Sequence, residues 1–148
     1  MKARDIMTPN PAVVTPDMPI ARAAEIMRDL DVGIVPVVDD VSRMHLEGVI
    51  TDRDIAVRCV AQKHDAKCRV SDHMTAHAID TVGPDASVAD VIAKMEQDRV
   101  RRIPVVDETK RVVGIIAQAD LAVKLGPREP LEVEHMLERV SEPVPALR

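Results

Sequence analysis

The sequence predicts an α+β fold built from two β-α-β-β-α repeats that pack through their sheets about a pseudo-twofold axis. The first observation behind this prediction is an internal duplication that covers most of the 148 residues. The second is the composition, because 46% of the residues are apolar but Phe, Tyr and Trp are absent. The core must therefore be aliphatic, and the abundant Val and Ile favour sheet.

The duplication consists of motifs that return 66 to 68 positions later in the chain. The offset falls by two between Asp39 and Gly48, which predicts a surface hairpin loop there, since loops tolerate changes of length. A copy of about 55 residues is marginal alone, so the two copies are expected to pack face to face and to form two related clefts. The returning motifs are Met7-Thr8 as Met74-Thr75, Pro36–Asp39 as Pro104–Asp107, and Gly48, Ile50 and Asp54 as Gly114, Ile116 and Asp120.

The elements of each copy follow from the local patterns. Short extended segments are expected at residues 12–14 and 78–79. Helices are expected to start near Ile20 and Val88, because apolar residues then recur at the spacing of one helical face, and Ser87 fits an N-cap. Continuous apolar runs predict buried strands, and each copy closes with a helix. The strands are expected at 34–38, 46–50, 103–106 and 111–116, and the closing helices at 52–61 and 118–125.

These elements predict a first domain at residues 1–62, a linker at 63–71, a second domain at 72–126 and a tail at 127–148. Residues 128–140 of the tail carry a weak helical pattern after Pro130, which is expected to dock on the module or on a partner subunit. Leu131, His135 and Leu137 mark this helix, and Pro143 and Pro145 are expected to stop it.

Composition and charge exclude several classes of protein. The net charge of −5 and the absence of aromatic stacking residues argue against nucleic-acid binding. No apolar run approaches the ~18 residues of a membrane span, and the charged N-terminus does not fit a signal peptide, so we expect a cytoplasmic protein without membrane contact. Cys59 and Cys68 stand nine positions apart, too far for a zinc signature, which leaves reduced thiols or a disulfide open.

The end of each repeat carries the candidate chemistry. Thr51 and Asp54 stand at a strand-to-helix junction, where a hydroxyl and a carboxylate have an ordinary role as helix caps. Ala117 cannot cap, yet Asp120 stands at the matching place, so the carboxylate is not explained by capping alone. Such a junction presents backbone N–H groups to an anion, and a carboxylate accepts well from a vicinal diol. Together these groups indicate a nucleotide site.

Arginines supply the countercharge that a phosphate needs. Arg53 lies inside the junction motif, and Arg101 and Arg102 lead into the buried strand of the second copy. The first copy has Gly33 and Ile34 at the positions of Arg101 and Arg102, so the two clefts are expected to differ in charge.

Catalytic motifs are absent from the sequence. The five His residues are scattered, the five Gly residues form no phosphate-binding loop, and there is no GxSxG elbow. His73 and His77 are four apart but flank a predicted strand start, so the spacing is better explained by chance than by a metal pair. We therefore expect no catalytic residues, no metal ligands and no enzyme activity.

The doubled pattern of Met-Thr, Pro-Val-Val-Asp and Gly-h-h-Thr-x-x-Asp (h, an apolar residue) resembles the CBS-domain family in its tandem form, the Bateman module. The resemblance covers residues 3 to about 125 and implies a module that binds adenosine-containing ligands in clefts between its copies. Many family members carry an appended enzyme, channel or DNA-binding segment, and this chain departs from them, so we expect a stand-alone module. It implies that Asp54 and Asp120 bind ribose, that Thr51 contacts ribose or phosphate, and that Arg53 and Arg102 meet phosphates. Adenine would lie near Thr8 to Val13 and Thr75 to Ile79, so that Asp54 works with the Thr75 segment and Asp120 with the Thr8 segment.

The expected function is sensing of energy or metabolite state through AMP, ADP or ATP, with S-adenosylmethionine or NAD less favoured. No obligatory cofactor is implied. A homodimer is expected, which acts on a regulated protein that the sequence does not identify. The loss of the hydroxyl at Ala117 weakens the expected Asp120 site, although Arg101 and Arg102 compensate. The alternative is a dimerisation or scaffold module that binds no ligand.

Overall fold

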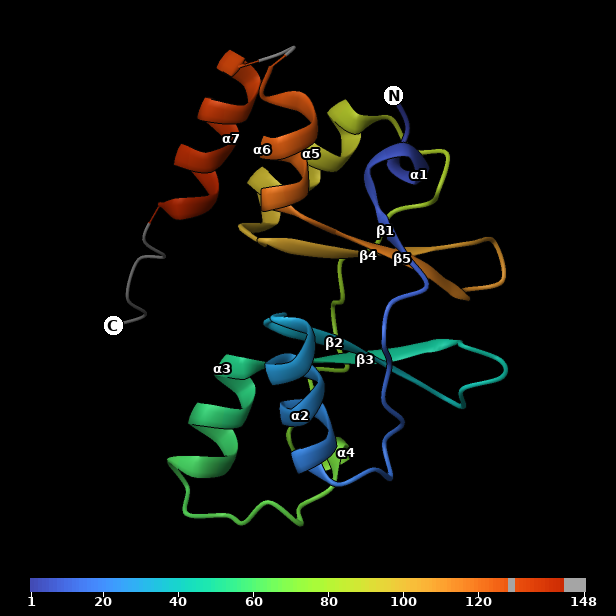
Figure 1. Ribbon diagram of the computed structural model, residues 1–148, viewed down its shortest axis with the longest axis vertical. Coiled ribbons are helices and arrows are strands. Elements are labelled where there is room, and N and C mark those ends of the chain that lie inside the picture. Colours follow the sequence, from blue (N-terminus) through green and yellow to red (C-terminus); the bar gives the residue numbers. More distant parts are fainter. Residues whose placement is uncertain (128–129, 143–148) are drawn as a thin grey trace. The chain divides into compact units, whose positions relative to one another are not determined.

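The structure, a computed structural model, describes residues 1–127 and 130–142, which fall into two compact units (Figure 1). The N-terminal unit contains Asn10–Ile79 and Val106–Val113, and the C-terminal unit contains Met1–Pro9, Asp80–Val105 and the chain from Gly114 onward. The units are therefore not the two sequence repeats. The segment that opens each repeat and carries its Met-Thr motif belongs to the unit formed mainly by the other repeat. Met7-Thr8 lies in the C-terminal unit, and Met74-Thr75 lies in the N-terminal unit.

The N-terminal unit packs its helices against a two-stranded antiparallel sheet of β2 (Ile34–Val38) and β3 (Leu46–Thr51). Val14 extends this sheet through a parallel bridge to Val37. The core is aliphatic and contains one thiol, that of Cys59. The helices of this unit are α2 (Ile20–Leu30), α3 (Asp52–Asp54), the π-helix η1 (Ile55–Val60) and α4 (Val70–His73).

The C-terminal unit is built on a sheet with the strand order β1-β5-β4, formed by β1 (Thr8–Pro9), β5 (Val112–Ala117) and β4 (Arg102–Val106). Val82 bridges to Val105 in parallel, as Val14 does in the other unit. The helices are α1 (Ala3–Ile6), α5 (Val88–Asp98), α6 (Gln118–Leu125) and α7 (Pro130–Ser141).

The long helices α2 and α5 begin at Ile20 and Val88, where the sequence predicts them to start. The Ser87 hydroxyl accepts a hydrogen bond from the backbone N–H of Asp90 at 3.1 Å, which confirms the N-cap of α5. Both helices end at a residue in the left-handed conformation, Asp31 with φ 52° and Arg99 with φ 53°. The two repeats therefore use the same local device to turn the chain from helix into strand.

The structure differs from the sequence expectation in two places. The helix expected at 52–61 is present over 52–60, but only its first turn, α3, is α-helical, and the π-helix η1 follows. The second extended segment lies at Val82 rather than at 78–79, because the chain bends at Ala78 with φ 54°. The expected tail helix forms and contacts α5 and α6; it buries Val133, Met136 and Val140, and Leu131 is exposed. The expected stop at Pro143 and Pro145 lies outside the described residues.

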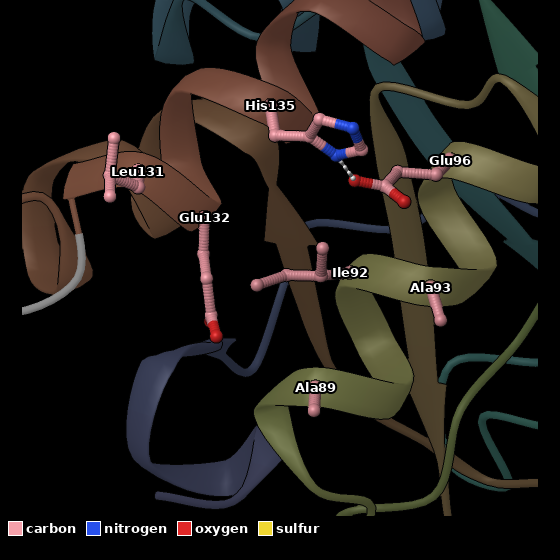
Figure 2. A pocket seen from close by; sticks show the side chains of 7 residues that line it. All are labelled: Ala89, Ile92, Ala93, Glu96, Leu131, Glu132 and His135. Carbon is pink, nitrogen blue, oxygen red and sulfur yellow. Dashed lines mark hydrogen bonds and ion pairs between the residues drawn. The ribbon is translucent and has the colours of Figure 1, made fainter.

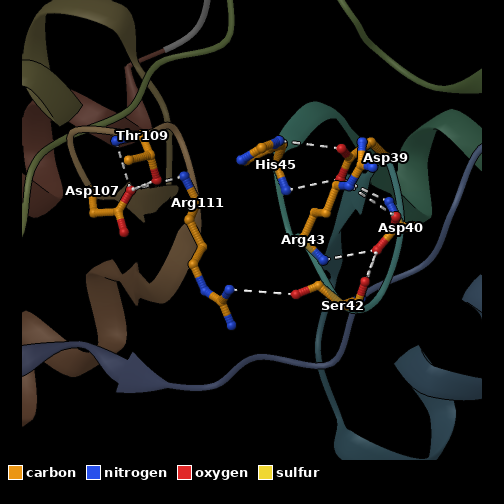
Figure 3. A network of polar contacts seen from close by, with 8 residues as sticks. All are labelled: Asp39, Asp40, Ser42, Arg43, His45, Asp107, Thr109 and Arg111. Atoms are coloured by element: carbon orange, nitrogen blue, oxygen red, sulfur yellow. Dashed lines mark hydrogen bonds and ion pairs between the residues drawn. The ribbon is translucent and has the colours of Figure 1, made fainter.

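The aspartates of the two Pro-Val-Val-Asp motifs organise hairpin turns within the N-terminal unit (Figure 3). Asp39 accepts from the backbone N–H groups of Asp40 at 2.7 Å and His45 at 3.0 Å. Asp107 accepts from the N–H of Arg111 at 3.0 Å, which closes the shorter second turn. These contacts confirm the predicted hairpin loop and explain the motif aspartates as turn residues.

None of the helices in the described part of the chain combines the length and the apolar character that crossing a lipid bilayer requires.

Candidate ligand-binding site

The candidate site in the N-terminal unit begins where β3 ends and α3 starts. The Thr51 hydroxyl accepts from the backbone N–H of Asp54, and Oδ2 of Asp54 accepts from the N–H of Thr51, both at 3.0 Å. This reciprocal capping box holds the Asp54 carboxylate in one orientation. The Asp54 side chain is only 12% exposed, so it is directed along the protein surface rather than into bulk water.

Thr75 and Arg58 complete the surroundings of the Asp54 carboxylate. The Thr75 hydroxyl donates to Oδ2 of Asp54 at 3.5 Å, which brings together two of the predicted site residues from different repeats. Nε of Arg58 lies 3.7 Å from Oδ1, an ion pair that is longer than a hydrogen bond. A carboxylate offers about four lone-pair positions, so Oδ1 retains capacity to accept from a ligand hydroxyl.

Gly48 explains how the Thr75 segment approaches this site. Val49 and Thr75 exchange backbone hydrogen bonds of 2.9 and 2.8 Å, which fix Thr75 against β3. A Cβ atom at Gly48 would lie 2.7 Å from the Thr75 carbonyl oxygen and 3.4 Å from Sδ of Met74. The Met74-Thr75 segment therefore packs closely over Gly48, where no side chain is in the way. The C-terminal unit has the same arrangement, because the Met7 side chain packs over Gly114.

The C-terminal unit repeats this junction without the capping hydroxyl. Oδ2 of Asp120 accepts from the N–H of Ala117 at 2.8 Å, so the acid caps the strand exit without a hydroxyl partner. Thr8 lies beside Ile115 of β5, two residues before Ala117. The ammonium group of Lys124 donates to the Ile6 carbonyl at 2.7 Å.

Arg101 and Arg102 lie beside the start of α6, because the Arg101 carbonyl accepts from the N–H of Gln118 at 2.9 Å. Arg102 is the half-buried first residue of β4, and Arg101 is exposed. Within the described residues, the side-chain Oε1 of Gln118 is buried and has no hydrogen-bond partner. Such an acceptor is costly to bury unless a donor reaches it, so this junction has an unused side-chain acceptor on the residue whose backbone N–H binds the Arg101 carbonyl.

The corresponding place in the N-terminal unit is uncharged. The Gly33 carbonyl accepts from the N–H of Asp52 at 3.0 Å, and Ile34 pairs with Thr51 across the β2–β3 sheet. The two junctions therefore differ in charge on the strand that leads into them, as the sequence predicts. Arg53 is exposed on α3 and is the arginine nearest in sequence to this junction.

Val13 and Ile79, which the resemblance places near adenine, are both half-buried. Among the described contacts, none brings either side chain to a junction carboxylate. Their role in base binding therefore stays a prediction.

Sequence reasoning missed one pair of residues at these junctions. Arg58 follows Asp54 by four positions and donates to the carbonyls of His73 and Met74, both at 3.3 Å. Lys124 follows Asp120 by the same interval and binds the equivalent carbonyl of Ile6. A cation at the fourth position after the motif aspartate, present in both repeats, was the sequence signal that identifies this pair.

A separate pocket lies between α5 and α7 in the C-terminal unit (Figure 2). Nδ1 of His135 lies 3.3 Å from Oε1 of Glu96 across this pocket, and Ala89 and Ala93 supply its small side chains. Since it contains none of the predicted site residues, it is distinct from the candidate ligand site. The lining residues are Ala89, Ile92, Ala93, Glu96, Leu131, Glu132 and His135.

Comparison with known proteins gives consistent matches. The CBS domain family model matches residues 3–60 and 70–126. CBS domain-containing protein YhcV of Bacillus subtilis (strain 168) is 40% identical over 120 residues, which are 81% of this chain and 82% of that protein. The crystal structure of Hypoxic Response Protein I (HRPI) with two coordinated zinc ions has a TM-score of 0.74 and 34% identity, covering 84% of this chain and 99% of that one.

A second solved structure is the CBS domain pair of protein MJ0100 in complex with 5-methylthioadenosine and S-adenosyl-L-methionine. It has a TM-score of 0.75 and 30% identity, covering 86% of this chain and 98% of that one.

The fold and its repeated junctions define a protein of mixed α/β structure that consists of two tandem β-α-β-β-α repeats with small sheets. The chain belongs to the CBS domain family, and it carries two CBS domains.

Proposed function

We propose that this protein is a regulatory module that binds adenosine-containing ligands of the AMP, ADP and ATP class at its two strand-to-helix junctions. The observation that carries the proposal is the Asp54 carboxylate, held by the Thr51 capping box and reached by the Thr75 hydroxyl of the other repeat. The Asp54 carboxylate is oriented before a ligand binds, so binding of a ribose diol does not cost the conformational entropy of ordering this side chain.

The ribose is the part of the ligand that this geometry accounts for best. Oδ1 of Asp54 has remaining acceptor capacity, and a charge-assisted hydrogen bond from a ribose hydroxyl contributes roughly 1.5–3 kcal/mol. Arg53 in the N-terminal unit, and Arg101 and Arg102 in the C-terminal unit, are the phosphate ligands of the proposal. The MJ0100 domain pair supports it, because both of that protein's ligands contain an adenosine moiety.

The two junctions are proposed to differ in affinity. The Asp120 junction has no hydroxyl at Ala117, but the strand that leads into it carries Arg101 and Arg102, and the buried Gln118 side chain has an unpartnered acceptor. The Asp54 junction has the complete capping box and the Thr75 hydroxyl. We assign the tighter site to Asp54.

Calorimetric titration of nucleotide-free protein with AMP, ATP and S-adenosylmethionine tests this proposal. Because the chain has no Trp or Tyr, an absorbance band near 260 nm in the purified protein reports a co-purified nucleotide directly. Asp54→Ala is expected to abolish binding at the first site, whereas Asp120→Ala has the smaller effect. Asp52→Ala is the matched control, since Asp52 is an exposed carboxylate on the same turn.

Failure of all three ligands to bind at millimolar concentration would refute the sensing function. Equal losses in the two variants, or losses in the reverse order, would refute the ranking of the sites. A thermal melt of each variant separates loss of binding from loss of the cap, which alone costs about 0.5–2 kcal/mol.

A homodimer is the second part of the proposal. Val57 on η1 and Val123 on α6 stand at equivalent repeat positions and are 45% and 76% exposed, and Val60 is 65% exposed. Exposed valines at matching places on the closing helices fit an isologous contact between two copies. Val57→Glu together with Val123→Glu is expected to convert the dimer to a monomer in light scattering, and a wild-type monomer would contradict this part.

A further inference from the structure

The N-terminal unit contains a cluster of metal-ligating side chains away from the Asp54 junction. Sγ of Cys59, Sγ of Cys68 and one ring nitrogen of His73 all lie within 4.8 Å of one another. Cys59 belongs to η1, Cys68 precedes α4, and His73 is the last residue of α4. The nine-residue spacing of the cysteines conceals the cluster in the sequence, because the loop between η1 and α4 folds back and brings them together.

The first and second repeats differ at the positions of Cys59 and His73, where the other repeat has residues that only pack in the core. Leu125 is the counterpart of Cys59, and Ile6 is the counterpart of His73. Both counterparts are buried apolar residues at a contact of α1 with α6, which matches the contact of α4 with η1. His73 is 4% exposed and is the one buried polar residue in the described part of the chain. Burying an imidazole where isoleucine suffices costs free energy, so this position points to a role beyond packing.

His64 lies beside His73, next to the group of three, and is the candidate for a fourth ligand. Its Nδ1 lies 3.3 Å from Nε2 of His73, and the residue is exposed on the loop, where it is free to adjust. With Zn–N bonds of about 2.0–2.1 Å, two imidazole nitrogens on a tetrahedral zinc ion are about 3.3 Å apart, which matches this contact. With the same tetrahedral geometry, two zinc-bound sulfurs are about 3.8 Å apart. The sulfurs of Cys59 and Cys68 lie within 4.8 Å of each other, so a small movement brings them to this separation.

The backbone around the cluster is ordered by its own hydrogen bonds. The N–H of His64 donates to the Cys59 carbonyl at 3.0 Å, and the carboxylate of Asp65 accepts from the N–H of Lys67 at 2.6 Å. Cys59 also lies in a π-helix, whereas the equivalent helix α6 is a regular α-helix. Segments of π-helix occur frequently at functional sites, and here the irregularity accompanies the ligating residues.

We propose that Cys59, Cys68, His73 and His64 form a binding site for zinc. Binding releases two thiol protons, so that two thiolates and two neutral imidazoles surround one Zn²⁺ ion with zero net charge. A neutral, four-coordinate, closed arrangement is typical of a structural zinc site, which here ties the end of η1 to α4.

A redox function fits the cluster less well. Both cysteines are free in the structure. Burial, together with the neighbouring Cys68 thiol, raises the pKa of Cys59, whereas reactive cysteines have lowered values. A disulfide between the two cysteines is therefore the competing outcome of the test.

The test is titration of the reduced, chelator-treated protein with Co²⁺ and then Zn²⁺. The expected result is one ion per chain, with thiolate-to-cobalt charge-transfer absorption and the visible bands of tetrahedral cobalt, both displaced by zinc. The absence of Trp, Tyr and Phe leaves the ultraviolet background low. Cys59→Ser and His73→Ile are each expected to weaken zinc binding on the order of 100-fold or more.

The controls separate metal binding from folding. His73→Ile reproduces the Ile6 arrangement, so it is expected to fold in the absence of zinc and to show no zinc-dependent rise in Tm, unlike the wild type. His77→Ala, four residues away and exposed, is expected to bind as the wild type does. The proposal is overturned by reduced protein that binds no zinc, by variants that bind as well as the wild type, or by thiols that only form a disulfide. None of these readouts involves a nucleotide.

Discussion

Gly48→Ala is the substitution that tests most directly how the two repeats build the Asp54 junction. A Cβ atom at this position would stand 2.7 Å from the carbonyl oxygen of Thr75. Carbon–oxygen contacts form at about 3.3–3.6 Å, so the Thr75 backbone must move by about 0.6 Å or more. The obstacle is backbone rather than a flexible side chain, and it cannot rotate away.

The magnitude follows from the hydrogen bonds that this movement breaks. Val49 and Thr75 exchange two backbone hydrogen bonds of 2.9 and 2.8 Å, each with a net contribution of about 0.5–1.5 kcal/mol. Losing both costs about 1–3 kcal/mol, and the reduced freedom of the unfolded chain returns about 0.4–1 kcal/mol. We expect a net loss of about 1.3 kcal/mol in the free energy of unfolding, the midpoint of a range of about 0 to 2.6 kcal/mol, and weaker nucleotide binding because Thr75 leaves Asp54.

The assay is urea unfolding followed by far-ultraviolet circular dichroism, since the chain has no Trp or Tyr for fluorescence. Gly83→Ala is the matched control, because a Cβ atom at Gly83 would have no other atom within 4 Å and would therefore cause no clash. The control is expected to be neutral or slightly stabilising. If Gly48→Ala were as stable as the wild type, or if both substitutions cost the same, the close approach of Thr75 to β3 would be refuted.

Three further substitutions test the packing, capping and electrostatics of the C-terminal unit. Met136→Ala on α7 is expected to cost about 2–5 kcal/mol in urea unfolding, because the side chain is fully buried, whereas Leu131→Ala, at a 79% exposed position, should change little. Ser87→Ala removes the N-cap of α5 and is expected to lower stability by about 0.5–2 kcal/mol; an unchanged urea midpoint would contradict the cap. Burial and a hydrogen bond with Asp98 raise the pKa of Asp80, so the folded state holds its proton more tightly, and the stability that the protonated Asp80 contributes falls as pH rises above about 4. In Asp80→Asn this fall is expected to be smaller between pH 4 and 7, and parallel curves would refute it.

Much of the fold was predictable because its signals are local. The apolar runs that became β2 and β4, the helical spacing of α5 and the Ser87 cap all depend on residues within one turn or strand. The duplication then set the order of the elements and the positions of Asp54 and Asp120. The departures have local causes that the patterns do not encode, such as the bend at Ala78 and the π-helix at Cys59.

The candidate site was predictable only in part. Asp54, Thr51 and Thr75 were found because they belong to repeated motifs. Arg58 was missed because a helical Arg four residues after an Asp has an ordinary surface explanation, and only the carbonyls of the Met-Thr segment show what it binds.

The sequence by itself determined the repeat, the order of the elements and the identity of the junction acids, because each is visible in short motifs of neighbouring residues and in the return of those motifs along the chain. Tertiary structure alone decided that each Met-Thr segment packs over the glycine of the other repeat, and that Cys59, Cys68 and His73 converge. The physical reason is that the number of residues between two segments does not determine whether the segments contact each other in the folded chain. They form where excluded volume and backbone hydrogen bonding allow two distant segments to meet.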